Sequence, residues 1–416
     1  MSSRYYSLDV FRGATVCLMI LVNNPGSWQQ IYPPLEHAAW HGLTPTDIVF
    51  PFFLFAVGNA LSFVMPKLKG TGDTTFWKKI LKRTALIFLI GLFLQWWPFF
   101  TWSNDHLVFR QWVDPTNSEN GVRILGVLQR IALCYFFASV TVYYLKPKRA
   151  LYFGLILLLL YWLLCYVGNP ADPYSLHSWF GTNVDKKILH VPHMYKGEGV
   201  PFDPEGIMST LSAIVEVIFG YVVGDYIQRK GKTQPGADNS SGPYQMLSGL
   251  FVIGVAFLLV GYWWDKVFPI NKKIWTSSFT IYTSGLATIT IATLIYLIEF
   301  KNKRGRFTKF FDVFGKNALF VFALSAFLPR TLALIRIPDH LDDQGKTVYI
   351  TPWGWLYQRV LVHIPGDPRI GSLAYAICVI SFMWLICWWL DRKKIYIKVC
   401  SKQPPLFARP SETICI

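Results

Sequence analysis

Long runs of apolar residues, each close to twenty residues in length, follow one another along almost the whole chain. A helix that crosses the roughly 30 Å hydrocarbon layer of a bilayer needs about 20 mainly apolar residues, because it rises about 1.5 Å per residue. Such runs lie at about 7–24, 46–66, 80–102, 122–145, 149–168, 206–227, 246–266, 276–299, 310–330 and 371–391. A bilayer offers the backbone no water, so these runs must be helical. The pattern predicts an all-α polytopic membrane protein, a bundle of about ten transmembrane helices.

The composition agrees with this class. Hydrophobic residues make up 53% of the 416 residues and charged residues only 15%, whereas a soluble chain carries about 25% charged residues. The formal net charge of +16 would fit a nucleic-acid partner, because basic patches follow phosphates. Here the basic residues form short clusters between apolar runs, which is their usual place in a membrane protein. We therefore expect no nucleic-acid partner.

The distribution of Lys and Arg predicts the side of the membrane that each loop faces. When basic residues at the ends of the runs are counted with the adjoining loops, the amino terminus, the loops after the even-numbered runs and the tail hold 24 of the 40 basic residues, and the loops after the odd-numbered runs hold 13. The remaining three, Arg12, Arg130 and Lys316, lie inside runs. The loop at 25–45 has none. Because cytoplasmic segments carry the excess of Lys and Arg, both termini are predicted to be cytoplasmic and the 25–45 loop to lie outside.

Three outer loops are long, near 103–121, 169–205 and 331–370, and their Pro, Gly, Trp, Tyr and His content favours ordered caps over a cavity. The inner segment 231–243 is rich in Gly, Pro, Ser and Asn and predicts a flexible linker. It divides the chain into an N-terminal half (1–230), which carries the loop 23–47, and a C-terminal half (244–400). We expect the two halves to form one integrated domain. No cleavable signal peptide is expected, because Asp9 and Arg12 precede the first apolar run and no small-residue cleavage site follows it.

Ionisable and amide side chains are concentrated in the first 60 residues. Asp9 and Arg12 lie three apart on one helix face, where they form either a structural salt bridge or part of a site. Asn23 and Asn24 end the first run, and Asn24-Pro25-Gly26 is also typical of a turn that terminates a helix. An ionisable group inside a membrane costs a few kcal/mol on insertion scales (about 2.5–3.5) and is a functional candidate for that reason.

The loop that follows contains His37 and His41 and ends with Asp47. Two interpretations of Asp47 are open: a member of a site, or a first-turn residue of the next helix, with Thr44 or Thr46 as the cap. A loop histidine is usually only solvated. His37, however, lies in a loop of low charge between two apolar runs, so it is a candidate for catalysis.

Further candidates lie deeper in the chain. Gln129 and Arg130 lie in the middle of a run, and an arginine there needs either an anionic ligand or an internal Asp or Glu. Lys316 and Asn317 begin the ninth run, where Lys316 either serves a site or extends to the inner surface. Glu216 is a similar case. Asp203 and Glu205 either hold the hydroxyl or amine of a glycan or belong to the first turn of a helix.

Several kinds of chemistry have no support. The chain has no phosphate-binding loop, no dinucleotide fingerprint, no HExxH and no GxSxG. No two cysteines have zinc-ligand spacing, and we expect no metal site and no disulfide framework. Five cysteines fall within apolar runs and two lie in the basic tail: Cys17, Cys134, Cys165, Cys378 and Cys387, then Cys400 and Cys415.

Four segments carry a resemblance to a known family. They are SLDVFRGATVCLMILVNNPG with HAAWHGLTPTDIVFPFFLFAVG; RILGVLQRIAL; FDPEGIMSTLSAI; and PINKKIWTSSFTIYTSG followed by FGKNALFVF. In these segments, spread over about residues 4–392, the chain resembles the transmembrane acyltransferases related to lysosomal heparan-α-glucosaminide N-acetyltransferase. The first segment is the most specific, because its V-N and H-A-x-W-x-G-L-T-x-x-D-x-V-F-P-x-F patterns are known to us from this family alone.

The resemblance implies a reaction and a set of residues. The family transfers acetyl from cytosolic acetyl-CoA to the amine of a glucosamine on the far side of the membrane, and its catalytic His and Asn correspond to His37 and Asn23. A neutral imidazole, with a reference pKa of about 6.5, can take the proton of the amine. An amide can donate to the thioester oxygen as it gains charge. His37 is thus expected as general base, or as carrier of the acetyl group, and Asn23 as donor.

The remaining candidates receive secondary roles. We expect Asp9, Arg12, Asp47 and Asn24 to support the site, Arg83, Arg130, Lys316 and Asn317 to bind acetyl-CoA, and Asp203 and Glu205 to bind the acceptor sugar. The luminal domain that precedes the spans in the animal enzyme is expected to be absent. This compact form suggests a bacterial inner (plasma) membrane, and the animal relative suggests a homodimer. The alternative function is an amino-sugar transporter without acyl transfer, which inverted repeats would favour.

Overall fold

The computed structural model describes residues 5–103, 105–231, 241–398 and 413–415. Within these ranges, eight helices are long and apolar enough to cross a membrane, and a bent pair of shorter helices makes a ninth candidate. The eight are α1 (Tyr6–Asn23), α2 (Val49–Lys69), α4 (Val127–Tyr144), α5 (Pro147–Gly168), α7 (Ile207–Lys230), α8 (Ser241–Trp264), α9 (Ser277–Ile295) and α13 (Pro368–Arg392). The predicted class, an all-α polytopic membrane protein, is confirmed.

Two of the predicted spans differ from the expectation. The run at 80–102 corresponds to α3 (Asp73–Trp96), whose first half carries Lys78, Lys79, Lys82 and Arg83; the helix has the length of a span but not the composition. The run at 310–330 is not one helix. It is divided into α10 (Arg306–Lys316) and α11 (Ala318–Leu332), which are bent by 78°.

The bend occurs at Asn317 because its side chain pairs with backbone outside the helix. Its Oδ1 accepts from Ile397 N at 2.8 Å and its Nδ2 donates to Ile395 O at 3.3 Å. These bonds connect the break to β5 (Tyr396–Lys398), which pairs in parallel with β6 (Thr413–Cys415).

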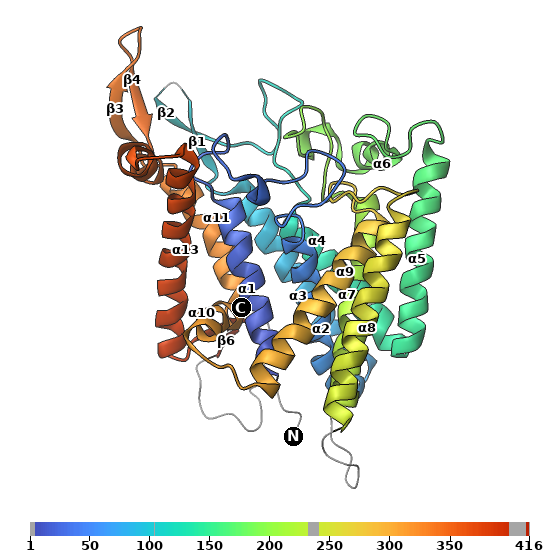
Figure 1. Cartoon of the computed structure of the whole chain (residues 1–416). Helices are drawn as coiled ribbons and strands as arrows, with labels where there is room; N and C mark the ends of the chain where they lie inside the picture. Colours follow the sequence, from blue (N-terminus) through green and yellow to red (C-terminus); the bar gives the residue numbers. More distant parts are fainter. Residues whose placement is uncertain (1–4, 104, 232–240, 399–412, 416) are drawn as a thin grey trace.

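The long loops gather at the end of the bundle opposite the start of α1 (Figure 1). Each contains regular structure: the antiparallel hairpin β1 (Phe100–Ser103) and β2 (His106–Phe109); α6 (Phe180–Leu189) with the short helix η2 (Val191–His193); and the hairpin β3 (Ile337–Leu341) and β4 (Thr347–Ile350), followed by α12 (Pro352–Trp355), η4 (Leu356–Val360) and η5 (Leu361–His363). The loop after α1 contains η1 (Pro33–Leu35), and a π-helical turn η3 (Tyr296–Phe300) extends α9.

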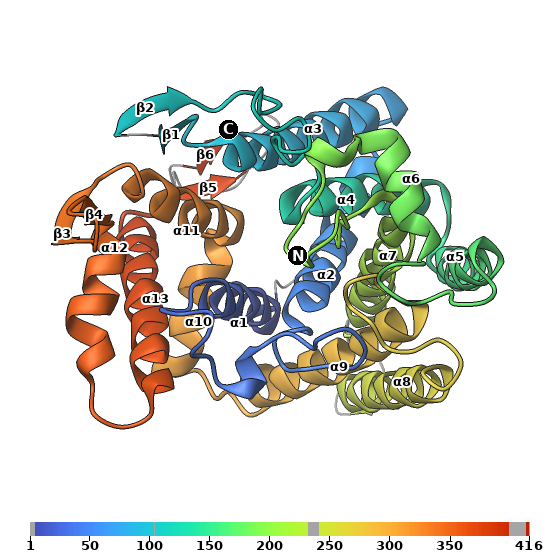
Figure 2. The ribbon, with the colours of Figure 1, turned by 90° about the horizontal axis from the view of Figure 1, so that it is seen from above.

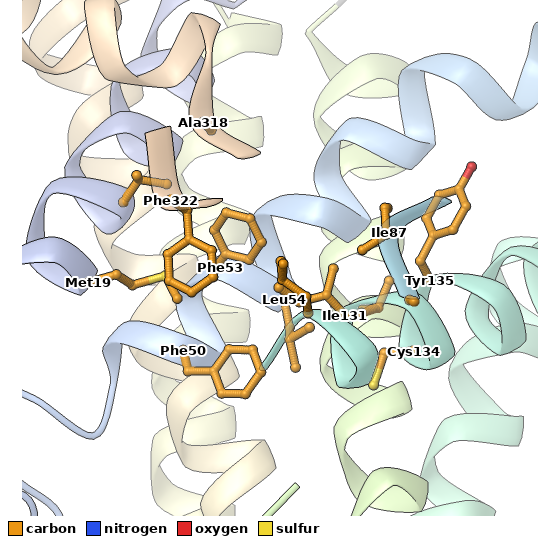
Figure 3. Packing of buried hydrophobic residues seen from close by; sticks show 14 of the residues in the cluster. Met19, Phe50, Phe53, Leu54, Ile87, Ile131, Cys134, Tyr135, Ala318 and Phe322 are labelled. Carbon is orange, nitrogen blue, oxygen red and sulfur yellow. The ribbon is translucent and has the colours of Figure 1, made fainter. Parts of the chain in front are cut away.

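The largest apolar cluster includes residues of α1, α2, α3, α4 and α11, among them Met19, Phe53, Leu54, Ile131 and Phe322 (Figure 3). Viewed from the loop end, α1 and α2 lie inside the bundle, whereas α5 and α8 form one edge and α13 the opposite one (Figure 2). The loop that connects α1 and α2 therefore begins and ends on helices inside the bundle.

The contact between α2 and α7 is unusually close because glycines form it. A Cβ on Gly58 would lie 2.0 Å from Val217 O, and a Cβ on Gly220 would lie 2.1 Å from Phe55 O. Small residues allow membrane helices to approach backbone to backbone. The two helices begin just after Asp47 and Glu205, so this contact fixes the two loops relative to each other.

Glu216 of α7 is fully buried and accepts hydrogen bonds from Thr283 and Ser284 of α9.

The five cysteines of the apolar runs are free thiols. The predicted linker 231–243 lies largely, and Cys400 entirely, outside the described residues.

Candidate active site

His37 and Asp47 are joined side chain to side chain at the loop end of the bundle. His37 Nδ1 lies 2.7 Å from Asp47 Oδ1. The other carboxylate oxygen of Asp47 accepts from the backbone N–H of Ala38 at 3.1 Å, and from the backbone N–H and hydroxyl of Thr44, each at 3.0 Å. Asp47 is fully buried, whereas His37 is partly exposed. The loop thus folds around one carboxylate and presents one imidazole.

Asp47 does not cap α2. The helix begins at Val49 with Ile48 as its N-cap and has no side-chain cap, so the interpretation of Thr44 or Thr46 as the cap was wrong. The side chain of Asp47 turns back into the loop because the loop offers it three donors. The carboxylate of Asp47 therefore pairs with His37 and does not cap α2.

The carboxylate of Asp47 is ionised. Burial acts to raise its pKa, but the hydrogen bond with His37, the charge of Lys272 and the two backbone N–H donors outweigh it and lower the pKa to about 2. An ionised carboxylate only accepts hydrogen bonds. His37 must donate through Nδ1, so that in the neutral form of the imidazole the lone pair lies on Nε2.

Lys272 is the third charged side chain at this point, and sequence reasoning missed it. It lies in the turn between α8 and α9, and its Nζ is 3.0 Å from His37 Nδ1, 3.2 Å from His37 Nε2 and 3.6 Å from Asp47 Oδ1. Its segment, PINKKIW, carried part of the resemblance, but its two lysines were used only to orient the loops. The feature of the sequence that could have indicated this residue was the pair of lysines just before Trp275, a residue that the structure shows to be buried.

These side chains border a cavity of about 210 Å³. The cavity takes its wall from both halves of the chain: the loop before α2, the segments before α4 and α7, and the turn before α9. It is lined by His37, Ala38, Trp40, Asp47, Arg123, Val127, Tyr195, Glu198, Pro204, Glu205, Lys272, Lys273 and Trp275. Aromatic surfaces and both signs of charge therefore face one small space beside the imidazole.

Arg123 organises the carboxylates that were predicted to bind the acceptor. It donates to both oxygens of Asp203, at 3.1 and 2.6 Å, and to Glu205 at 2.5 Å, and its guanidinium stacks on Tyr195. Glu205 lines the cavity, whereas Asp203 is fully buried behind it. Burial raises the pKa of Asp203, and Arg123 holds the pKa of Glu205 below its usual value. Neither residue belongs to the first turn of α7, which begins at Ile207.

Arg130 lies beneath this cavity in the first turn of α4. Its guanidinium is fully buried, stacks on Trp275 at 5.0 Å and donates to Gly206 O at 3.2 Å and to the hydroxyl of Ser209. The expected alternative of an internal Asp or Glu was wrong, since no carboxylate pairs with Arg130 in the described structure. Through Gly206 and Ser209, Arg130 holds the start of α7.

The other three predicted acetyl-CoA ligands have protein neighbours. Lys316 lies 2.7 Å from Asp312 and 3.0 Å from Asp391, so it does not extend freely to the surface. Asn317 bonds to the backbone of the β5 segment, as described above. Arg83 stacks on Tyr135 at 4.8 Å and stays within the basic cluster of α3.

The first-helix residues are divided between the two ends of α1. Asp9 and Arg12 pair at 3.3 Å near its start, and Arg12 also donates to Gly315 O. Asn24 donates to Ile20 O at 2.8 Å, which fits the helix-terminating interpretation. Asn23 is the exposed last residue of α1, and no hydrogen bond joins it to His37 in the described part of the chain.

Comparison with known proteins finds similarity to one kind of enzyme. Residues 4–192 match the model of the catalytic region of heparan-alpha-glucosaminide N-acetyltransferase. The chain is 27% identical over 352 residues to the Homo sapiens heparan-alpha-glucosaminide N-acetyltransferase, covering 72% of this chain and 49% of the relative. The Mus musculus protein of the same name is 24% identical over 353 residues, covering 72% and 50%. The chain thus spans about half the length of these relatives. In sequence the chain is therefore similar to heparan-α-glucosaminide N-acetyltransferase, and residues 4–192 are similar to its catalytic region.

Proposed function

We propose that this chain is a membrane acetyltransferase, which moves acetyl from acetyl-CoA made in the cytosol to the amine of a glucosamine-type sugar on the other side of a bacterial plasma membrane. The observation that carries the proposal is the hydrogen bond between His37 Nδ1 and Asp47, which leaves Nε2 beside a cavity. This is the arrangement that a general base requires.

In the proposed reaction the acceptor amine attacks the carbonyl carbon of the thioester. The N–C bond forms, His37 Nε2 takes a proton from the amine, the C–S bond breaks, and the leaving thiolate takes a proton. A positioned base of this kind typically contributes about 10²–10⁴-fold. Asn23 is the proposed donor to the thioester oxygen, because α1 ends with it at the same end of the bundle as the loop of His37.

The cavity wall supports an amino sugar as the acceptor. Glu198 and Glu205 offer carboxylates that accept hydrogen bonds from hydroxyl groups or from an ammonium. Trp40 and Tyr195 offer apolar ring surfaces, against which the C–H face of a sugar can pack. We expect Asp203 to act indirectly, by holding Arg123 in place.

The donor is proposed to enter from the opposite end of the bundle. Arg83 lies with Lys78, Lys79 and Lys82 on α3, and these cations suit the phosphates of the nucleotide end of acetyl-CoA. The pantetheine arm would then extend between the helices towards His37. Because Lys272 and Trp275 come from the second half and His37 and Arg123 from the first, we propose that the two halves act as one unit.

The test is acetyl transfer by the purified protein in nanodiscs, with labelled acetyl-CoA and glucosamine, scored as N-acetylglucosamine. We expect transfer by the native protein, none by His37→Ala, and native activity from His41→Ala. The second variant is a matched control, because His41 lies in the same loop but outside the cavity wall. Normal transfer by a folded His37→Ala would remove His37 from the chemistry. Uptake of amino sugar into sealed vesicles without acetyl transfer would identify a transporter instead.

The same preparation separates direct transfer from an acetyl-imidazole. Protein incubated with labelled acetyl-CoA alone would retain label on His37 in the second case, and hydroxylamine would release it. Direct transfer leaves His37 unlabelled.

A further inference from the structure

We propose that Lys272 is a positioning residue for His37: its ammonium provides the positive charge opposite Asp47, so that the imidazole stays neutral and Nε2 remains able to accept a proton. The inference rests on the proposed function in that it concerns the same imidazole. It assigns a role to a residue from the other half of the chain.

The geometry places the ammonium beside the ring without consuming its basic nitrogen. Lys272 Nζ is almost equally far from Nδ1 and Nε2, at 3.0 and 3.2 Å. The in-plane bonding directions of two ring nitrogens diverge, so one ammonium cannot lie along both. Nδ1 already donates to Asp47. The contact is therefore mainly electrostatic, and the lone pair of Nε2 can still meet an acceptor amine.

The charges around the cavity balance only when His37 is neutral. Two groups of ion pairs beside the cavity do not involve Lys272. Lys273 pairs with Glu198 at 2.6 Å, and Arg123 pairs with Asp203 and Glu205. The charged side chains that line the cavity besides His37 are three cations and three anions: Arg123, Lys272 and Lys273 against Asp47, Glu198 and Glu205. A protonated His37 would be a fourth cation.

Charged groups from two other segments and from its own turn act on the ammonium of Lys272. They are Asp47 before α2, Glu205 before α7 and Lys273 in its own turn. Burial lowers the pKa of Lys272, and Asp47 and then Glu205 counteract that effect. Tyr195 is uncharged near neutral pH, because a phenol has a reference pKa of about 10, and burial raises the pKa further. Asp47 alone would favour the imidazolium, and Lys272 opposes it because a like charge disfavours the charged form.

The same opposition has a consequence for the reaction. Once Nε2 has taken a proton from the amine, the imidazolium lies beside an ammonium. That proton is then readily passed to the leaving thiolate, which completes the transfer and returns His37 to its neutral form.

The test compares Lys272→Met with Lys272→Arg, which keeps the charge, and Lys272→Gln serves if the Met variant does not fold. For acetyl transfer we expect the acid limb of the kcat/KM profile to move to higher pH by about one unit or more in Lys272→Met and to stay in place in Lys272→Arg. A lysine with only a structural role would lower activity without moving the limb.

A second readout does not depend on catalysis. The rate at which diethyl pyrocarbonate modifies His37 reports its neutral fraction, and mass spectrometry of peptides resolves it from the exposed His106, which serves as internal reference. The pH dependence at His37 should move upward in Lys272→Met only. An identical pH dependence in the native protein and Lys272→Met would overturn the inference. The expected shift in a protein that transfers no acetyl would support the inference and refute the proposed function alone.

Discussion

The imidazole of His37 and the carboxylate of Asp47, ten residues apart, meet at 2.7 Å across a loop that connects α1 and α2. The loop closes because Asp47 collects donors from Ala38 and Thr44 as well. One buried carboxylate thus fixes both the shape of the loop and the tautomer of the imidazole.

Replacing Asp47 by Asn should remove this control. The amide would present its NH₂ or its oxygen to Nδ1, and the first choice moves the ring proton to Nε2, where no base remains. We expect kcat for acetyl transfer to fall by about 10²–10⁴-fold with little change in KM. Thr44→Val is the control, because it removes one hydrogen bond to Asp47 and keeps the charge. A native kcat in a folded Asp47→Asn would contradict the assignment.

Arg123→Met should destabilise the protein. The substitution leaves the buried carboxylate of Asp203 and the cavity-lining Glu205 without their shared cation. Breaking a buried pair in this way costs about 3–5 kcal/mol. We expect a lower midpoint of thermal unfolding in detergent, and a partial recovery when Asp203→Asn and Glu205→Gln are added. A triple variant no more stable than Arg123→Met would show that the carboxylates do not depend on Arg123.

The class of fold and the position of His37 could be predicted from the sequence, and the partners of His37 only in part. Spans are readable because a bilayer imposes length and apolar composition on each helix separately. The bend at Asn317 was not readable, since it depends on bonds to Ile395 and Ile397, almost 80 residues later.

The same limit applies to the site. His37 and Asp47 lie within one motif, so their pairing follows from a short stretch of chain. Lys272 and Arg123 reach the cavity only because α2, α4, α7 and α9 pack together, and a single sequence does not display that packing. The positive charges of Lys272 and Arg123 were visible in the sequence, but both residues were counted only among the basic residues of the outer loops.

The stability of the protein should depend on pH through Asp185 of α6. Its Oδ1 accepts from Ile207 N at 2.9 Å, its Oδ2 is buried without a hydrogen-bond partner, and burial raises its pKa from 3.8 to about 7. Between pH about 4 and about 7 the unfolded chain has lost this proton and the folded chain retains it. The free energy of unfolding should therefore fall as the pH rises, by about 1.4 kcal/mol per unit in this window.

Asp185→Asn removes that dependence, because an amide does not titrate. We expect the variant to gain stability relative to the native protein between pH 4.5 and pH 8, by a few kcal/mol (about 3–4). Thermal unfolding of both proteins at the two pH values measures it, and the comparison cancels the other titrating groups. The same stability difference at both pH values would show that Asp185 is ionised in the folded protein.

The close contact between α2 and α7 should be required for both stability and activity. Gly58→Ala and Gly220→Ala each place a methyl group about 2 Å from a backbone carbonyl oxygen, that of Val217 or of Phe55. Such overpacking typically costs about 1–3 kcal/mol. Because backbone cannot move aside like a flexible side chain, the helices must separate, and Asp47 and Glu205 at their ends must shift. We expect lower unfolding midpoints and reduced kcat in both variants. Gly305→Ala is the matched control, since nothing lies within 4 Å of the added carbon. If Gly58→Ala unfolded at the same temperature as Gly305→Ala, the packing of α2 on α7 would not be what holds the two loops together.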